Sequence, residues 1–241
     1  MTDAGLTIVS IYPTLLGTYG DGGNVMVLVH RAGLREISTE VIEVAPGEAV
    51  PTTADIYVLG GGEDTAQVAA ANELRTDGGL AAAAASGAAI LAICAGYQLL
   101  GEYFPDATGQ PAAGVGLLDI RTDRLPDRAV GELVAQPNNP ATPVITDLIT
   151  GYENHAGATH LGPTVAPLAA TRHGIGNGDR TEGAVSGHRI GTYAHGPALA
   201  RNPQLADQLL TWATGRDLSP LNEPEVTELR RERLRTVLGQ R

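Results

Sequence analysis

Lysine is absent from this chain of 241 residues, and all 16 basic side chains are arginines. A Walker-type phosphate loop, a pyridoxal Schiff base and a lysine-assisted nucleophile each require a lysine amine. The composition therefore excludes those enzyme classes. Positive charge is also scarce, since 27 acidic residues give the chain a net charge of -11 and a pI near 4.9. Nucleic acid or an anionic membrane surface is a poor main partner for such a chain.

Cysteine occurs once, as Cys94, which excludes an internal disulfide and a cysteine-based zinc site. A single free thiol fits a reducing cytosol. The first five residues carry no basic segment of the kind that opens a signal peptide, and no apolar run reaches transmembrane length. We expect a cytoplasmic protein with no stable membrane insertion.

Strand-like and helix-like patterns alternate through the first hundred residues, which predicts an α/β fold with a doubly wound, mostly parallel sheet flanked by helices. Short β-like pieces separated by Gly, Pro and Asn follow from 110 to about 193, and we expect them to extend the sheet with added antiparallel strands. No linker requires a second domain, so 1–241 is predicted as one domain with a C-terminal arginine-rich helix at about 224–238. The expected strands are 6–12, 40–44, 55–59 and 88–93, and the expected helices are 24–33, 65–86 with a break at 77–79, and 203–214.

Cys94 follows the apolar segment 88–93 directly, and the residues after it have helical spacing. This is the pattern of a strand-to-helix elbow, which projects a side chain from the sheet toward the first free N–H groups of a helix. A free cysteine is usually a small buried hydrophobe. The elbow favours a nucleophile instead, because the start of a helix stabilises a thiolate.

A cysteine nucleophile needs a base and a site for the oxyanion. Of six histidines, only His195 lies in a strand-then-glycine context, although a histidine there is more often structural. The glycine triplet 60–62 after a strand could offer N–H groups to a developing negative charge, but alone it is a weak signal. His155 and His160 lack the usual spacing of metal ligands. The glycine spacing of 17–24 is wrong for a dinucleotide fingerprint, so a shaped loop is expected there.

Four segments together resemble the class I glutamine amidotransferases of the cobyric acid synthase-like (CobB/CobQ-type) subgroup: GGGED (60–64), ICAGYQ (93–98), GYENH (151–155) and GTYAHGP (191–197). Within that family, YGDGGN (19–24) and the stand-alone length resemble the GatD type, the glutaminase subunits of lipid II isoglutaminyl synthases. The resemblance covers roughly residues 6 to 215. It implies a flavodoxin-like fold and hydrolysis of L-glutamine to glutamate.

The resemblance also assigns roles to residues. Cys94 is expected to attack the glutamine amide and His195 to move protons. The oxyanion hole is expected from Gly61, Gly62 and Ala95, and substrate contacts from Arg128 and Gln98, the latter as a substrate or a packing contact. No metal and no cofactor are expected in this chain. ATP and Mg²⁺ are expected on a Mur-ligase-like partner of the MurT type, which in a heterodimer would use the ammonia to amidate the D-glutamate α-carboxyl of lipid II.

One position departs from the family pattern. Most class I amidotransferases place a glutamate two residues after the catalytic histidine, whereas here Pro197 stands two residues after His195 and Ala198 follows it. Either Glu153 or Asp21 supplies the acid, or the partner does, and the last is favoured here. Three other readings stay open: a glutaminase serving a cobalamin precursor, a DJ-1-like cysteine protein, and a non-catalytic scaffold.

Overall fold

The computed structural model describes residues 5–17 and 20–239. Its main sheet has six strands in the order β11-β12-β4-β3-β1-β2, all parallel except β11, which runs antiparallel to β12. The strands are β1 (Leu6–Ile11), β2 (Thr39–Val44), β3 (Ile56–Leu59), β4 (Ala89–Ile93), β11 (Ala184–Ser186) and β12 (Arg189–Thr192). The predicted doubly wound α/β fold is confirmed.

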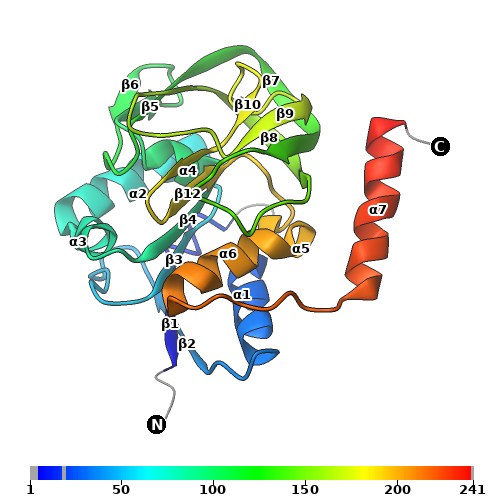
Figure 1. The fold of residues 1–241 in the computed structure, drawn as a ribbon. Helices are drawn as coiled ribbons and strands as arrows, with labels where there is room; N and C mark the ends of the chain where they lie inside the picture. Colours follow the sequence, from blue (N-terminus) through cyan, green and yellow to red (C-terminus); the bar gives the residue numbers. More distant parts are fainter. Residues whose placement is uncertain (1–4, 18–19, 240–241) are drawn as a thin grey trace.

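The chain reverses its direction of winding between β1 and β3. From β1 it crosses outward to β2, whereas from β3 it crosses the other way to β4, so right-handed crossovers place α1 and α2 on opposite faces. Helices α1 and α6 pack together on one side, and α2 and α4 contact each other on the other side (Figure 1). The helices around this sheet are α1 (Gly23–Gly33), α2 (Asp64–Asp77), α3 (Gly79–Ala85), α4 (Ala95–Leu99), α5 (Ala198–Arg201) and α6 (Pro203–Thr214). In such a sheet, binding sites form at the carboxyl ends of the strands near the reversal.

The residues from 110 to 193 differ from the prediction. Of the strands in this stretch, β11 and β12 join the main sheet, and only β11 is antiparallel there. The others, together with β5, form a second sheet in the order β10-β9-β7-β5-β6 with β8 paired to β7. Its strands are β5 (Tyr103–Pro105), β6 (Pro111–Ala113), β7 (Ile120–Pro137), β8 (Ile149–Leu161), β9 (Ala169–His173) and β10 (Thr181–Glu182).

The prediction of short pieces is wrong for β7 and β8, which have 18 and 13 residues. A β-bulge between Arg124 and Ala129 shifts the register of β7 against β8, and the strand continues beyond it. In β8 the glycines mark close contacts instead of breaks: a Cβ on Gly157 would lie 2.2 Å from Nε2 of Gln98. Glycine signals alone therefore could not distinguish a strand end from a crowded strand interior.

The second sheet lies against the carboxyl ends of β4 and β12. Strand β8 is joined to the segment after β12 by two backbone bonds, from Tyr152 N–H to the His195 carbonyl at 3.2 Å and from His195 N–H to the Tyr152 carbonyl at 2.9 Å. This contact brings the GYENH segment and the His195 segment to one edge.

The last helix, α7 (Pro224–Leu238), stands beside the body of the molecule and has no buried residue (Figure 1). Arg230 anchors it by donating to the Leu148 carbonyl at 2.8 Å. Among the residues that the structure describes, no helix has both the length and the apolarity needed to cross a membrane.

Candidate active site

Cys94 lies at a strained elbow between two short elements. Strand β4 ends at Ile93, α4 begins at Ala95, and Cys94 itself has φ 50° and ψ -105°. A non-glycine residue in this region costs on the order of 1–3 kcal/mol, which the surrounding bonds must offset. The Cys94 N–H donates to the Thr192 carbonyl at 2.9 Å, and the Cys94 carbonyl accepts from Gln98 N–H at 3.0 Å. The predicted elbow is confirmed.

Gly96 makes the elbow possible by letting two loops approach. Its N–H donates to the Gly60 carbonyl at 3.1 Å, and a Cβ at this position would lie 2.8 Å from the same oxygen. The loop after β3 is thereby fixed against the start of α4. The glycine triplet and the cysteine meet at the sheet edge, as the sequence predicts.

His195 lies beside Cys94 and is oriented by an internal carboxylate. Its Nδ1 is 3.1 Å from Oδ2 and 3.3 Å from Oδ1 of Asp21, and both side chains are almost fully buried. Asp21 belongs to the loop after β1. Of the three sources considered for the acid, the structure places Asp21 at His195, so the ring does not need the favoured source, a carboxylate from a partner, to be oriented. Ala198 is not a gap in this site, because Asp21 reaches His195 from another loop.

The protonated form of His195 is strongly favoured. Burial lowers the pKa of the ring, but hydrogen bonds to Asp21 and Cys94 outweigh burial, and the pKa is raised to about 10. The ring is thus an imidazolium at neutral pH. A protonated ring beside Cys94 can give its proton to a leaving group that is attacked by the sulfur.

Gly61 has a different role from the one expected. Its N–H donates to Oδ2 of Asp21 at 2.7 Å, so it is already bound and does not point to an oxyanion. A Cβ on Gly61 would lie 2.7 Å from Cε1 of His195. A glycine is therefore needed at this position because the ring packs closely against its backbone. Within the described ranges, neither the N–H of Gly62 nor the N–H of Ala95 donates a hydrogen bond. These two remain the candidates for the oxyanion hole.

A polar pocket opens next to the thiol. Its walls come from the loop after β3, the start of α4, and strands β7 and β8. Predicted residues in its lining are Gly62, Cys94, Ala95, Gln98 and Arg128. The pocket therefore brings the expected nucleophile and the expected substrate contacts together.

Arg128 is held at the pocket by Asn154. Its Nε donates to Oδ1 of Asn154 at 2.6 Å, and its Nη2 donates to the Asn154 main-chain oxygen at 3.3 Å. A second arginine of β7, Arg124, also lines the pocket and was not predicted. The two arginines are four positions apart, and strand alternation places such residues on one face, so this signal in the sequence could have identified Arg124.

Gln98 has protein partners for both ends of its amide. Its Oε1 accepts from Nε2 of Gln67 at 2.9 Å, and its Nε2 donates to the Tyr193 hydroxyl at 3.1 Å. Of the two roles left open for this residue, the geometry supports the packing contact, which fixes the pocket wall.

The comparisons with known proteins agree with this geometry. The family model of the CobB/CobQ-like glutamine amidotransferase domain matches residues 7–203. The chain belongs to this family. Family membership replaces the DJ-1-like reading of the elbow.

Relatives of this amidotransferase include subunit GatD of lipid II isoglutaminyl synthase (glutamine-hydrolyzing) from two bacteria. The Staphylococcus aureus subunit is 34% identical, with 92% of this chain and 89% of the relative covered. The Streptococcus pneumoniae subunit is 30% identical, with 86% and 80% covered. A cobyric acid synthase from Sphingopyxis alaskensis is 36% identical, but only 35% of its length is covered.

Solved structures support the fold. A crystal structure of a glutamine amidotransferase aligns with a TM-score of 0.56 at 16% identity, covering 85% of this chain and 98% of the other. A glutamine amidotransferase from Thermotoga maritima aligns with a TM-score of 0.54 at 15% identity, covering 98% and 90%. At these identities the likeness concerns the fold alone.

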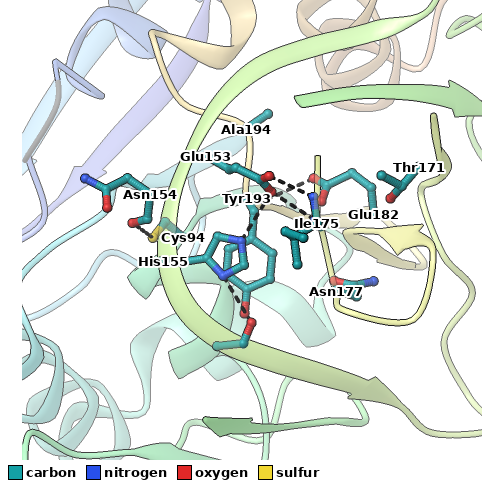
Figure 2. A network of polar contacts seen from close by, with 12 residues as sticks. Cys94, Glu153, Asn154, His155, Thr171, Ile175, Asn177, Glu182, Tyr193 and Ala194 are labelled. Carbon is teal, nitrogen blue, oxygen red and sulfur yellow. Dashed lines mark hydrogen bonds and ion pairs between the residues drawn. The ribbon is translucent and has the colours of Figure 1, made fainter. Parts of the chain in front are cut away.

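Next to the amidotransferase site lies a network of polar side chains that the sequence did not predict. Figure 2 shows a buried network in which Glu153, His155, Glu182 and Tyr193 lie close to Cys94 and Asn154. The His155 ring stacks on Tyr193, with ring centroids 3.6 Å apart and planes at 10°. The family motifs contain His155 and Tyr193, but only the fold shows that they touch.

The two histidines considered as metal ligands do not converge. His155 is buried in this network, whereas His160 is exposed and lies 3.3 Å from Asp123. Among residues 5–17 and 20–239, no group of three or more His, Cys, Asp or Glu side chains is arranged to hold a metal ion.

Proposed function

We propose that this chain hydrolyses L-glutamine with Cys94 as nucleophile and passes the ammonia to an ATP-dependent partner. The partner is a Mur-ligase-like synthetase of the MurT type, and the product is lipid II amidated on the α-carboxyl of D-glutamate. The observation that carries the glutaminase half is the placement of Cys94 at the elbow, beside a histidine that Asp21 orients.

The chemistry follows the geometry in two steps. The Cys94 thiolate attacks the side-chain amide carbon of glutamine, the C–N bond breaks, and ammonia leaves with a proton from His195. A thioester remains on Cys94. His195, now neutral, removes a proton from water, whose oxygen attacks the thioester carbon. The C–S bond then breaks, glutamate leaves and its new carboxyl loses a proton to solvent, and the Cys94 thiolate and the His195 imidazolium are restored.

Two N–H groups are placed to stabilise the tetrahedral oxyanion. The Ala95 N–H lies at the start of α4, directly after the nucleophile, and the Gly62 N–H lies in the loop that Gly96 holds against that helix. Loss of one such donor in other enzymes costs about 10²- to 10³-fold in kcat. We assign the oxyanion hole to these two groups.

Arg128 is the group that holds the α-carboxylate of glutamine. A guanidinium binds a carboxylate in a planar, two-point arrangement, and Arg128 offers this group at the pocket that contains the thiol. Arg124 adds a second positive charge to the same lining.

The acceptor is inferred from the relatives. Two relatives matched over most of their length are named as glutamine-hydrolyzing subunits of lipid II isoglutaminyl synthase, which implies a second, synthetase subunit. The ATP and Mg²⁺ needed to activate a carboxylate belong to that partner. A cobalamin precursor is the second candidate acceptor, but the cobyric acid synthases that match are about three times longer than the matched region.

The test is reconstitution with the Mur-ligase-like partner, ATP, Mg²⁺, glutamine and lipid II, followed by mass analysis of lipid II. We expect the mass change of carboxyl to amide, and its loss with Cys94→Ala or His195→Ala. If ammonia supports amidation while glutamine does not, the glutaminase assignment is wrong. If glutamine is hydrolysed and lipid II stays unmodified while a cobalamin precursor is amidated, the acceptor is wrong.

A further inference from the structure

One residue of β8 contacts both ends of the proposed glutamine site. The main-chain oxygen of Asn154 lies 3.9 Å from the Cys94 sulfur, a contact drawn in Figure 2. The same oxygen accepts from Nη2 of Arg128 at 3.3 Å, and the Asn154 side-chain oxygen accepts from Nε of Arg128 at 2.6 Å. Asn154 therefore links the nucleophile to the guanidinium.

The residues on either side of Asn154 anchor the strand from its other face. Side chains alternate along a strand, so Glu153 and His155 both point away from Asn154, and both are buried. Glu153 accepts from the N–H of Ile175 at 2.7 Å and from that of Gly176 at 2.9 Å. These bonds tie β8 to the loop after β9.

His155 is held on three sides. Its Nδ1 donates to the Gly157 carbonyl at 3.0 Å, and its Nε2 lies 3.5 Å from Oε2 of Glu153. Its ring lies flat on Tyr193, whose hydroxyl accepts from the Gln98 amide in the pocket wall. Figure 2 shows His155 and Tyr193 stacked next to the strand that carries Asn154. A strand anchored at both neighbours of Asn154 has little freedom to move that residue relative to Cys94.

We propose that Asn154 is a positioning residue that sets the span between Arg128 and Cys94 and thereby selects glutamine over asparagine. The proposal rests on the proposed function, because Arg128 is taken to bind the α-carboxylate and Cys94 to attack the amide. Asparagine is one methylene shorter, so a molecule held by its carboxylate cannot also bring its amide carbon to the sulfur at the same spacing. Discrimination by one methylene is typically about 10- to 200-fold, and a displacement of about 1 Å at the reacting atoms can cost about 10²-fold.

The test compares kcat and KM for glutamine and asparagine in the full chain with its partner. Asn154→Ala removes the bond to Nε of Arg128 and leaves the guanidinium with only the weaker bond from Nη2 to the main-chain oxygen at this position. We expect KM for glutamine to rise about tenfold, kcat to change less than about threefold, and the glutamine-to-asparagine ratio of kcat/KM to fall about tenfold. Asn72→Ala is the matched control, because Asn72 also accepts from an arginine, Arg75, but on the exposed surface of α2.

Glu153→Gln tests the anchor beneath Asn154. It keeps the side chain's shape and removes the charge facing His155, so it should lower the same ratio without abolishing hydrolysis. Where Asn154→Ala does not fold, Asn154→Asp keeps the shape and pairs a carboxylate with Arg128, which should raise KM by competition.

Two outcomes contradict the proposal: an unchanged glutamine-to-asparagine ratio in the Asn154 variants, or a loss confined to kcat. Either result with an active wild-type chain leaves the glutaminase assignment intact. An inactive wild-type complex, with no hydrolysis sensitive to Cys94→Ala, contradicts the proposed function instead.

Discussion

The Nδ1 atom of His195 lies 3.1 Å from Oδ2 of Asp21, although 174 positions separate the two residues in the sequence. The same Asp21 oxygen accepts the Gly61 N–H at 2.7 Å. One carboxylate thus orients the histidine and fixes the glycine loop that packs against it. The loops after β1, β3 and β12 are joined at this point.

Asp21→Asn should impair catalysis more than binding. The amide keeps the shape of the carboxylate but removes its charge, so the imidazolium is less favoured and the ring loses its preferred tautomer. We expect kcat for glutamine hydrolysis to fall by about 10²-fold or more, with KM changed by less than about threefold. Steady-state hydrolysis measures both. A kcat within threefold of wild type would contradict the role given to Asp21.

The alkaline limit of activity should report the ionisation of His195. Because the pKa of His195 is raised to about 10, the imidazolium persists through neutral pH and is lost only as the pH rises toward 10. We expect kcat/KM for glutamine to fall with an alkaline midpoint near that value, and the midpoint to move downward in Asp21→Asn. A pH profile of kcat/KM from pH 6 to 11 tests this. An alkaline midpoint near 6.5 in the wild type contradicts it.

Gly61→Ala should disturb the histidine directly. The added Cβ would lie 2.7 Å from Cε1 of His195, so the ring must move away from its place between Asp21 and Cys94. We expect kcat to fall by about tenfold or more, since a displacement of about 1 Å is costly at reacting atoms. Gly33→Ala is the control, because a Cβ there meets nothing within 4 Å. Equal activity of the two variants in a hydrolysis assay would contradict the claim that close packing of Gly61 holds the His195 ring in place.

Glu182 should make folding stability depend on pH. Burial raises the pKa of this carboxyl to about 7, although hydrogen bonds from the Thr192 hydroxyl and the Tyr193 N–H act in the opposite direction and lower it. Between pH 4.5 and 7 the folded chain holds a proton that the unfolded chain has released, so stability falls as the pH rises. Glu182→Gln removes this titration while keeping the shape.

The difference in unfolding free energy between Glu182→Gln and wild type should shift in favour of the variant by about 3 kcal/mol as the pH rises from 4.5 to 7. Above pH 7 this difference should stay constant. Denaturant unfolding at several pH values measures the difference. Glu40→Gln, at an exposed position of β2, is the matched control. A difference that stays constant across this range contradicts the buried titration.

The sequence predicts the centre of the site because its signals are local. An apolar strand followed at once by helical spacing places Cys94 at an elbow, and this prediction depends only on residues within a few positions of each other. The strand-then-glycine pattern puts His195 at a strand end, and the resemblance of four short motifs to an amidotransferase family assigns it a role beside Cys94. The parallel sheet follows from the same short-range alternation of strands and helices.

The remaining features depend on contacts between distant segments. Asp21 reaches His195 only because the sheet reverses its winding between β1 and β3, which brings the loop after β1 to the edge where β4 and β12 end. No periodicity in the chain encodes that contact. The same holds for Gly61, which was expected to bind an oxyanion and instead binds Asp21. Thr18 and Tyr19 of the loop expected over 17–24 lie outside the described residues.

The most direct test of the account is covalent labelling of the chain, with its partner present, by a glutamine-mimicking electrophile such as 6-diazo-5-oxo-L-norleucine. Intact mass and peptide mapping give the number and position of adducts. We predict one adduct, on the peptide that contains Cys94, with labelling absent in Cys94→Ala and slowed by at least about tenfold in His195→Ala and Asp21→Asn. Labelling of wild type at another residue, or an equal rate in the His195 variant, would contradict it.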